Sequence, residues 1–199
     1  MPTFVPVKRA LTVVATVLLV AAVVVGLSQA GGSNGGSGKS GEAKGTAAKE
    51  LAGAPAPLAK LHQQAGALLG GGAGAYRARL AELRGYPVVV NKWASWCGPC
   101  RSEFPFFEKV AREQGKKVAF LGVNSSDNDA SAKDFYSQFD MSYPSYKDPD
   151  SHIAQVFNGV AAFPVTVFYD AHGKQRYLHQ GGYTSEQRLR DDIRRYTAS

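Results

Sequence analysis

Hydrophobic and polar positions divide the chain into an apolar N-terminal segment, a polar spacer and a region where helix and strand patterns alternate. Residues 10–27 form an uncharged run, and Lys8 and Arg9 directly precede it. The run is longer than a signal-peptide core of about 7 to 15 residues and slightly shorter than a spanning helix of about 20. Only Thr12 and Thr16 interrupt it, so a buried amphipathic core helix is the weaker interpretation.

The apolar run predicts export of everything that follows it. Ser28 and Ala30 are small residues at the positions that a signal peptidase reads, so residues 1–30 are predicted to be either a signal peptide cleaved near Ala30 or a retained signal anchor. In both cases the basic flank stays in the cytoplasm. Residues 31–53 are predicted to be a flexible Gly/Ser-rich linker, because they bury too little apolar surface to offset the entropy of ordering. Residues 54–199 are predicted to form one domain.

Helical and strand periodicities alternate within that domain. Short apolar runs at residues 88–90 and 118–123 are typical of buried strands, and the helical spacing over residues 100–114 completes a βαβ unit. The remaining predicted helices are residues 58–69, 76–83, 130–139 and 185–196, and the remaining predicted strands are residues 165–169 and 176–180. A short turn joins the last two strands, so they should form an antiparallel hairpin. Together these elements predict an α/β fold with a mixed central sheet flanked by helices.

Composition and charge narrow the class of protein. The chain has 199 residues, of which 44% are hydrophobic, which suits one domain plus attachments. The formal net charge is +7, but the basic residues near the C-terminus alternate with acidic ones, as on a solvated helix face. We therefore expect no nucleic-acid partner. The chain has only two cysteines, which excludes a small scaffold held by several disulfides.

The two cysteines form one local pair in the segment Cys97-Gly98-Pro99-Cys100, directly after a predicted strand and at the start of a predicted helix. Two intervening residues bring both sulfurs within one helical turn, so a disulfide can form without moving the backbone. At a helix N-terminus, the first sulfur meets unpaired backbone N–H groups and the positive end of the helix dipole, which favour the thiolate. Cys97 is therefore predicted to be the exposed nucleophile, and Cys100 the buried thiol that resolves the mixed disulfide.

Metal binding and a structural crosslink are the competing interpretations of the cysteine pair. A structural zinc site needs about four ligands, and the chain has no second cysteine pair and no two histidines at a suitable spacing. A purely structural disulfide would close a very small loop and constrain little of the unfolded chain. We therefore expect redox chemistry at the cysteines, without a metal or a cofactor.

The stretch VVVNKWASWCGPCRSEFP, residues 88–105, resembles the active-site segment of the thioredoxin superfamily and specifically of its TlpA/ResA-like thiol-disulfide oxidoreductases. The segments GVNSSD, YPSYKDPD and FPVTVFYDAHGK, followed by Gly181-Gly182, occur in the order that the family has. The resemblance covers residues 86–196. It implies a thioredoxin fold and an extracytoplasmic enzyme that exchanges disulfides with protein substrates.

The same resemblance implies a set of substrate-binding residues around the cysteines. Pro164 corresponds to the family's cis-proline, which offers backbone groups to a bound partner, and Phe163 before it is bulkier than usual. Trp96 lies beside the active site in most members, although core packing is an equally simple interpretation. With Gly98 and Pro99 between the cysteines, these residues form the predicted substrate-binding set.

Asn91 and Glu103 are the two positions that concern proton handling. The resemblance implies that Glu103, rather than the residue at Asn91, takes the proton from Cys100, and the i, i+3 spacing places Glu103 on the same side of the helix as Cys100. A solvated glutamate in the first helical turns is the alternative.

Lys92 departs from the family pattern. It must point opposite to Asn91 and Trp93, and therefore has to reach solvent or find a partner.

The predicted function is reduction of protein disulfides, because the Gly-Pro dipeptide matches that of thioredoxin, whose potential is about −270 mV. The resemblance makes apocytochrome c a plausible substrate. We expect a monomer, tethered by residues 10–27 or secreted, with a membrane electron donor or acceptor that the sequence does not identify. The alternatives are an oxidant or isomerase of exported proteins, a noncatalytic binding module, a copper chaperone, and a peroxiredoxin-type peroxidase. The peroxidase would need a proline and a threonine where Val90 and Ala94 stand.

Overall fold

The computed structural model describes residue 47 and residues 49–197. The predicted membrane segment, residues 10–27, and most of the predicted linker lie outside the described residues. Among the helices that are described, none combines the length and the apolar character that crossing a bilayer requires. Leu51, which falls in the range predicted as linker, is buried.

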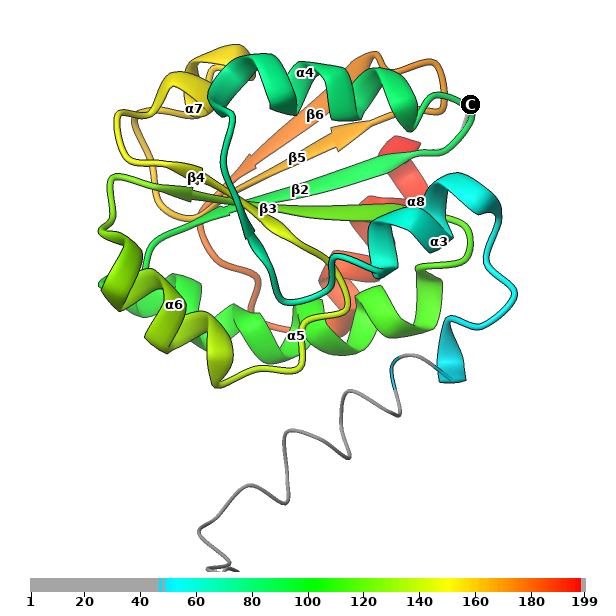
Figure 1. Cartoon of the computed structure of the whole chain (residues 1–199), viewed down its shortest axis with the longest axis horizontal. Helices are drawn as coiled ribbons and strands as arrows, with labels where there is room; N and C mark the ends of the chain where they lie inside the picture. The colour runs from blue at the N-terminus through cyan, green and yellow to red at the C-terminus, as the bar shows by residue number, and fades with distance from the viewer. Residues whose placement is uncertain (1–46, 48, 198–199) are drawn as a thin grey trace, which may run out of the picture. The chain divides into compact units, whose positions relative to one another are not determined.

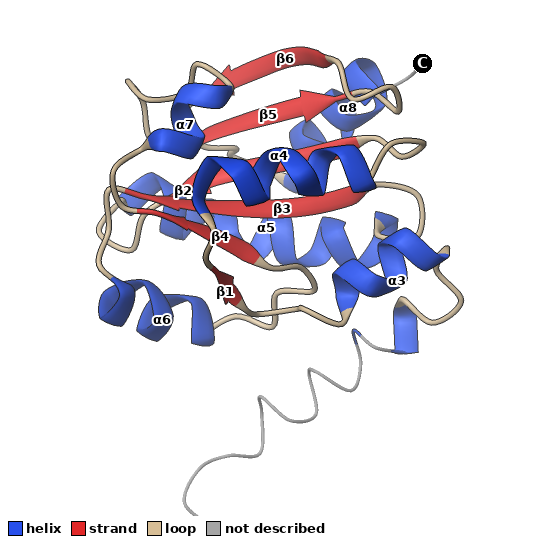
Figure 2. Cartoon of the chain, turned by 45° about the horizontal axis from the view of Figure 1, so that its top comes forward, coloured by secondary structure: helices blue, strands red, loops and turns tan. Residues whose placement is uncertain are grey.

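A six-stranded mixed sheet forms the centre of the domain, with the strand order β1-β4-β3-β2-β5-β6 (Figure 2). The strands are β1 (Leu68–Leu69), β2 (Val88–Trp93), β3 (Ala119–Ser125), β4 (Ser145–Asp148), β5 (Val165–Tyr169) and β6 (Gln175–Gln180). The first four strands of the sheet order run parallel, whereas β5 is antiparallel to both β2 and β6. The predicted mixed sheet, the βαβ unit and the final hairpin are all confirmed.

Helices cover both faces of this sheet. They are α3 (Ala56–His62), α4 (Gly72–Glu82), α5 (Gly98–Gln114), α6 (Asp129–Ser137), α7 (His152–Val156) and α8 (Glu186–Thr197). In Figure 1, α4 and α7 lie above the sheet and α5 and α6 lie below it. Buried residues of α8 belong to the same core layer as those of α5, and buried residues of α3 to the same layer as those of α4. The sheet therefore has a hydrophobic core on each side.

The central strand β2 contributes to both cores, because successive side chains of a strand point to opposite faces. Val89 and Trp93 belong to the core under α5, and Val88 and Val90 belong to the core under α4. All six residues of β2 are buried. Its two polar positions therefore lie inside the protein, one on each side of the sheet.

Two parts of the predicted secondary structure are wrong. The predicted helix 58–69 ends at His62, and Leu68–Leu69 form the short edge strand β1, which pairs with Ser145 and Tyr146. The second error is an omission, since β4 and α7 were not predicted. The β4 sequence SYKD is mostly polar and α7 has only 5 residues, so neither carries a strong apolar period of its own.

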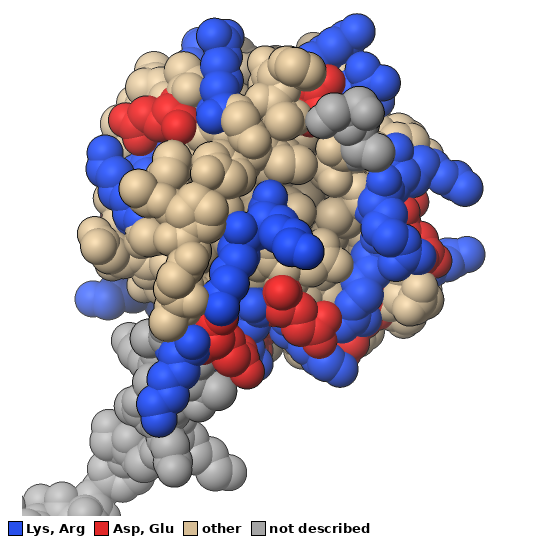
Figure 3. All heavy atoms as spheres, turned by 90° about the vertical axis from the view of Figure 1, so that its right-hand side faces the viewer, with Lys and Arg blue, Asp and Glu red and all other residues tan. Residues whose placement is uncertain are grey.

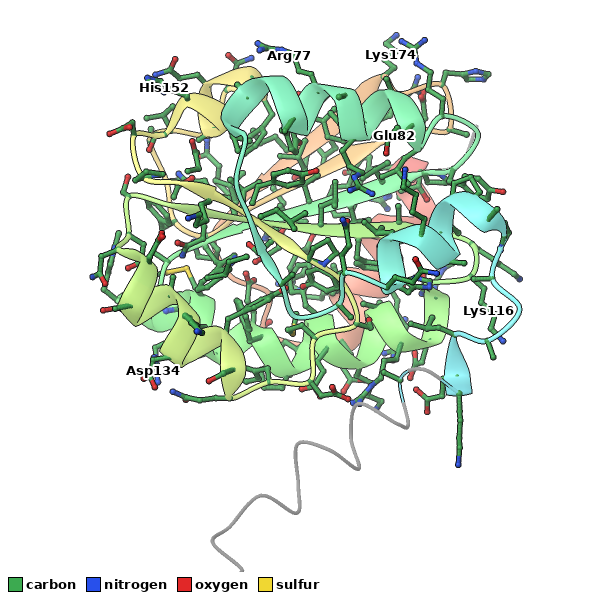
Figure 4. All side chains as sticks on the ribbon, viewed as in Figure 1. Arg77, Glu82, Lys116, Asp134, His152 and Lys174 are labelled. Atoms are coloured by element: carbon green, nitrogen blue, oxygen red, sulfur yellow. A yellow bond between two sulfur atoms is a disulfide. The ribbon has the colours of Figure 1, made fainter. Side chains whose placement is uncertain are left out.

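The two ends of the sheet differ in chemistry. Figure 4 shows the disulfide at the end of the domain that carries His152, away from Lys116 and Lys174. The parallel strands β2 and β3 end on the disulfide side, where loops between strands and helices gather. Figure 3 views the opposite end, over which many Lys and Arg side chains project. The candidate chemistry is therefore confined to one end of the sheet.

Candidate active site

The predicted cysteine pair is a disulfide at the start of α5. Cys97 is the N-cap residue, and its Sγ accepts a hydrogen bond from the backbone N–H of Cys100 at 3.2 Å. The two Cα atoms are 5.3 Å apart. Cys97 is 4% exposed and Cys100 is fully buried, so only Cys97 offers any surface to a partner. The expected order of exposure holds, but Cys97 is far less exposed in this oxidised state than expected, because its sulfur folds back onto the first helical turn.

Glu103 lies one helical turn after Cys100 and is fully buried. Its Oε1 accepts a hydrogen bond from Asn91 Nδ2 at 2.6 Å, and its Oε2 accepts one from the backbone N–H of Tyr183 at 2.9 Å. Burial raises the pKa of Glu103 to about 7, although the two hydrogen bonds act in the opposite direction. The alternative of a solvated glutamate is therefore wrong, and the carboxyl can change protonation state near neutral pH.

Two further polar atoms lie near the carboxyl on this side of the sheet. Asn91 stands opposite Thr166 in the pairing of β2 with β5. Asn91 Oδ1 and Thr166 Oγ1 are both buried and have no hydrogen-bond partner within the described part of the chain. Buried polar atoms that lack a hydrogen-bond partner are uncommon in proteins. The surroundings of Glu103 therefore combine burial with few compensating hydrogen bonds.

Trp96 and Phe163 form an aromatic pair next to the disulfide. Trp96 is 59% exposed, and its Nε1 donates a hydrogen bond to the backbone oxygen of Ser126 at 2.9 Å. The Trp96 and Phe163 ring centroids are 4.9 Å apart. Core packing is therefore the wrong interpretation of Trp96. The peptide bond between Phe163 and Pro164 is cis, as the family resemblance implied.

The remaining predicted substrate-binding residues also lie at this end. Gly98 and Pro99 are exposed at the first turn of α5. Gly182 packs against Pro99 and Pro164, since a Cβ added there would lie 3.4 Å from the backbone oxygen of Pro99 and 3.7 Å from Cγ of Pro164. The predicted residues therefore lie together at this end of the domain: Trp96, Gly98 and Pro99 flank the cysteines along the chain, Phe163 packs against Trp96, and Gly182 contacts both Pro99 and Pro164.

Asp127 is a site residue that the sequence did not single out. Its carboxylate accepts hydrogen bonds from the backbone N–H of Ser95 at 2.6 Å and the hydroxyl of Ser95 at 2.9 Å, as well as from Asn124 and Asn128. Burial acts to raise the pKa of Asp127, but these hydrogen bonds outweigh it and hold the pKa below its ordinary value. The carboxylate fixes the loop that carries Trp96. Its only sequence signal was its place in the family-like segment GVNSSD.

Lys92 has the partner that its position in a buried strand requires. The residue is fully buried, and its Nζ donates hydrogen bonds to the backbone oxygens of Gly159 at 2.6 Å, Val160 at 3.1 Å and Ala162 at 2.8 Å. The same Nζ lies 3.6 Å from the centroid of the Phe163 ring. Burial lowers the pKa of Lys92 to about 8, and the charge of Asp148 offsets part of this shift.

Comparisons with known proteins agree with this fold and site. The family description Redoxin matches residues 52–193. The chain is 31% identical to the thioredoxin-like protein YneN of Bacillus subtilis, covering 56% of this chain and 66% of that protein. It is 30% identical to the thiol-disulfide oxidoreductase ResA of Halalkalibacterium halodurans (54% and 61% covered) and 35% identical to the thiol:disulfide interchange protein DsbE of Pseudomonas fluorescens (57% and 61% covered). The matched part thus spans less than two thirds of the length of each relative.

Solved structures give the same result. A putative thiol:disulfide interchange protein DsbE from Chlorobium tepidum aligns with a TM-score of 0.53 at 27% identity, covering 59% of this chain and 84% of that one. A DsbF homologue from Corynebacterium diphtheriae aligns with a TM-score of 0.52 at 28% identity, covering 58% and 75%. The predicted thioredoxin-like fold and the resemblance to ResA-like proteins are confirmed. Names that denote thiol-disulfide oxidoreductases agree with the predicted enzyme class.

Proposed function

This chain belongs to the Redoxin family, and from that premise we propose that it is an extracytoplasmic thiol-disulfide oxidoreductase that reduces disulfides of protein substrates. The observation that carries the proposal is the Cys97–Cys100 disulfide at the N-terminus of α5, one helical turn before the buried carboxyl of Glu103. A helix N-terminus favours the thiolate of the first cysteine. A buried carboxyl with a pKa of about 7 suits proton transfer at neutral pH.

The proposed reaction uses both cysteines. In the reduced protein, the Cys97 thiolate attacks one sulfur of a substrate disulfide, forming a mixed disulfide while the other substrate sulfur leaves as a thiolate. Cys100 then attacks Cys97 Sγ, which forms the intramolecular disulfide and releases the second substrate sulfur. Two electrons pass from the dithiol to the substrate. Glu103 takes the proton of the Cys100 thiol, and both thiol protons end on the substrate.

The oxidised pair must then be reduced again. An external dithiol on a membrane or exported protein would supply the two electrons by the same exchange in reverse. The apolar residues 10–27 place the domain outside the cytoplasm in this proposal, either tethered or secreted. Apocytochrome c, whose cysteines must be reduced before haem attachment, is the substrate that the family resemblance suggests. We further propose that the protein acts as a monomer.

The reduction potential of the cysteine pair tests the proposed direction of electron flow. We expect a value near that of thioredoxin, about −270 mV, because Gly98 and Pro99 stand between the cysteines. A value near the −120 mV of strongly oxidising relatives would show that the protein is an oxidant instead. Reduction of insulin with dithiothreitol as the electron donor tests the activity itself. The protein should accelerate this reaction, and a variant with both cysteines replaced by alanine is the control.

A further inference from the structure

Lys92 is the least expected residue of the core. It is the fifth residue of a six-residue strand that is buried throughout, on the face that carries Val88 and Val90. A buried ammonium must exchange its hydration for protein acceptors, and an apolar side chain of similar size costs less to bury there. The lowered pKa of Lys92 agrees with a net cost of holding the charge in this place. Stability alone therefore does not account for a lysine in this position.

The acceptors of Lys92 all come from one loop. An ammonium has three N–H donors, and here the three acceptors are the backbone oxygens of Gly159, Val160 and Ala162. This loop joins α7 to β5, and residues 159–163 belong to no helix or strand. Gly159 is itself tightly enclosed, because a Cβ added there would lie 2.3 Å from the Phe157 ring. Lys92 therefore supplies the loop with hydrogen bonds that a strand or helix partner would otherwise provide.

The same ammonium also contacts the face of the Phe163 ring, at 3.6 Å from its centroid. Such a cation–π contact stabilises one position of the ring. Phe163 in turn packs against Trp96, which is largely exposed beside Cys97. A buried cation, a loop and an aromatic pair thus form a continuous path from the core to the surface around the disulfide.

We propose that Lys92 is a positioning residue for substrate binding: it holds residues 159–163 and the Phe163 ring in place, so that Phe163 and Trp96 form a fixed apolar platform beside Cys97. The inference rests on the proposed disulfide exchange with proteins. The loop sequence GVAAF carries no charge, and Val160 in the same loop is 45% exposed. The platform therefore favours a substrate segment with an apolar or aromatic side chain next to the reacting cysteine.

Lys92→Met tests this role, because methionine keeps the length of the side chain and removes the ammonium. With dithiothreitol as donor, the KM for insulin should rise about tenfold, which corresponds to about 1.4 kcal/mol, while kcat stays within about twofold of the wild type. The rate with hydroxyethyl disulfide, which is too small to use the platform, should not change. The melting temperature should fall, as in the control below, because the three backbone oxygens lose their donor; the separation of KM from kcat therefore carries the test.

Arg79→Met is the matched control. Arg79 is a second buried cation under the same face of the sheet, where it donates hydrogen bonds to Tyr146 at 3.3 Å and Gln64 at 2.7 Å. Its loss should lower the melting temperature and leave the KM for insulin unchanged. An unchanged KM in Lys92→Met would overturn the proposal. An equal loss of rate with insulin and hydroxyethyl disulfide would also overturn it, in favour of a general structural role.

Hydrogen exchange separates this inference from the proposed function. In Lys92→Met, the backbone amides of residues 159–163 should exchange about tenfold faster than in the wild type, because their loop has lost its hydrogen-bond donor. Amides of β2 and α5 should be unaffected. Unchanged exchange in residues 159–163 would refute the positioning role even if the wild type reduces insulin. If the wild type fails to reduce insulin, the proposed function fails, and the exchange result still decides whether Lys92 holds the loop.

Discussion

One buried ionisable group lies on each face of β2, Glu103 on one face and Lys92 on the other, and the two groups differ in what surrounds them. On the α5 face, the Glu103 carboxyl accepts two hydrogen bonds, one of them from Asn91. On the opposite face, the Lys92 ammonium donates three, all to the loop before Pro164. Asn91 and Lys92 are adjacent in sequence, so the alternation of one strand separates these two environments.

Burial moves both pKa values towards neutrality, but the consequences differ. The pKa of Glu103 rises to about 7, so its carboxyl can gain or lose a proton at the pH where thiols react. The pKa of Lys92 falls only to about 8, so the ammonium stays mainly protonated at neutral pH and keeps all three donors. The Glu103 carboxyl is therefore suited to transferring a proton, and the Lys92 ammonium to holding the loop before Pro164 in place. We therefore assign proton transfer to the α5 face of β2 and the positioning of the substrate-binding residues to the opposite face.

If the groups on both faces of β2 act on the same cysteine pair, activity must depend on Cys97. Cys97→Ala should therefore lower dithiothreitol-driven insulin reduction by at least about a thousandfold, as loss of a nucleophile does in enzymes that act through a covalent intermediate. The rate of insulin precipitation measures this directly. Activity within tenfold of the wild type would mean that the cysteine pair is not the reacting group, and that neither face of β2 has the proposed role.

Glu103→Gln tests proton transfer by Glu103 on the α5 face of β2. We expect the rate of mixed-disulfide resolution at pH 8 to fall about a hundredfold, within the usual range for loss of a general base. The wild-type rate should increase through a pKa near 7, and the variant should lack this step. Rapid-mixing kinetics between pH 5 and 9 provide the measurement.

Glu108→Gln is the control for that experiment. Glu108 lies on the same helix but pairs with Arg112, at 3.2 Å between Oε1 and Nη2. This variant should keep the wild-type pH profile. If Glu103→Gln also keeps it, Glu103 has no part in proton transfer and the contrast between the two faces disappears.

The buried carboxyl should also make stability depend on pH. Between the ordinary glutamate pKa of 4.5 and the native value of about 7, the native state keeps a proton that the unfolded chain releases. The free energy of unfolding should therefore fall as pH rises through this window, by about 3 kcal/mol in total from this group, and then level off. Urea unfolding of the wild type and Glu103→Gln gives the difference. If the difference in free energy of unfolding between the wild type and Glu103→Gln does not vary with pH, it would contradict the raised pKa of Glu103.

Phe163→Leu tests the contact between Lys92 and the Phe163 ring, and its expected effect is the smallest. Leucine is apolar but cannot make the cation–π contact with Lys92, so the KM for insulin should rise about threefold, at the lower end of the energy of such contacts. The kcat and the pH profile should match those of the wild type. A shift of the pH profile would show that the two faces of β2 are coupled rather than separate.

Local sequence patterns predicted the part of the protein that carries the cysteines. The apolar run of β2, the spacing of α5 and the Cys-Gly-Pro-Cys segment are adjacent in the chain, so periodicity and motif were sufficient. The position of Glu103 followed from helical spacing and family resemblance. Its raised pKa did not, because it comes from burial among segments far apart in the chain; the backbone N–H of Tyr183, which partly offsets the shift, is also distant in sequence.

The wrong prediction for residues 58–69 and the unpredicted partner of Lys92 have the same physical origin. The apolar spacing of residues 58–69 fits a helix, but Leu68 and Leu69 pair with β4, whose own sequence is mostly polar. Lys92 was recognised as a side chain in need of a partner, and the partner proved to be a loop that only the tertiary structure brings near. Pairing and burial between distant segments override local preference in each case.

Trapping with Cys100→Ala tests the central claim most directly. Without its resolving thiol, the protein should accumulate a mixed disulfide between Cys97 and insulin, visible by intact mass as a one-to-one adduct that dithiothreitol dissociates. Cys97→Ala should give no such adduct. Equal trapping by both variants, or none by either, would contradict the account in which Cys97 attacks and Cys100 resolves.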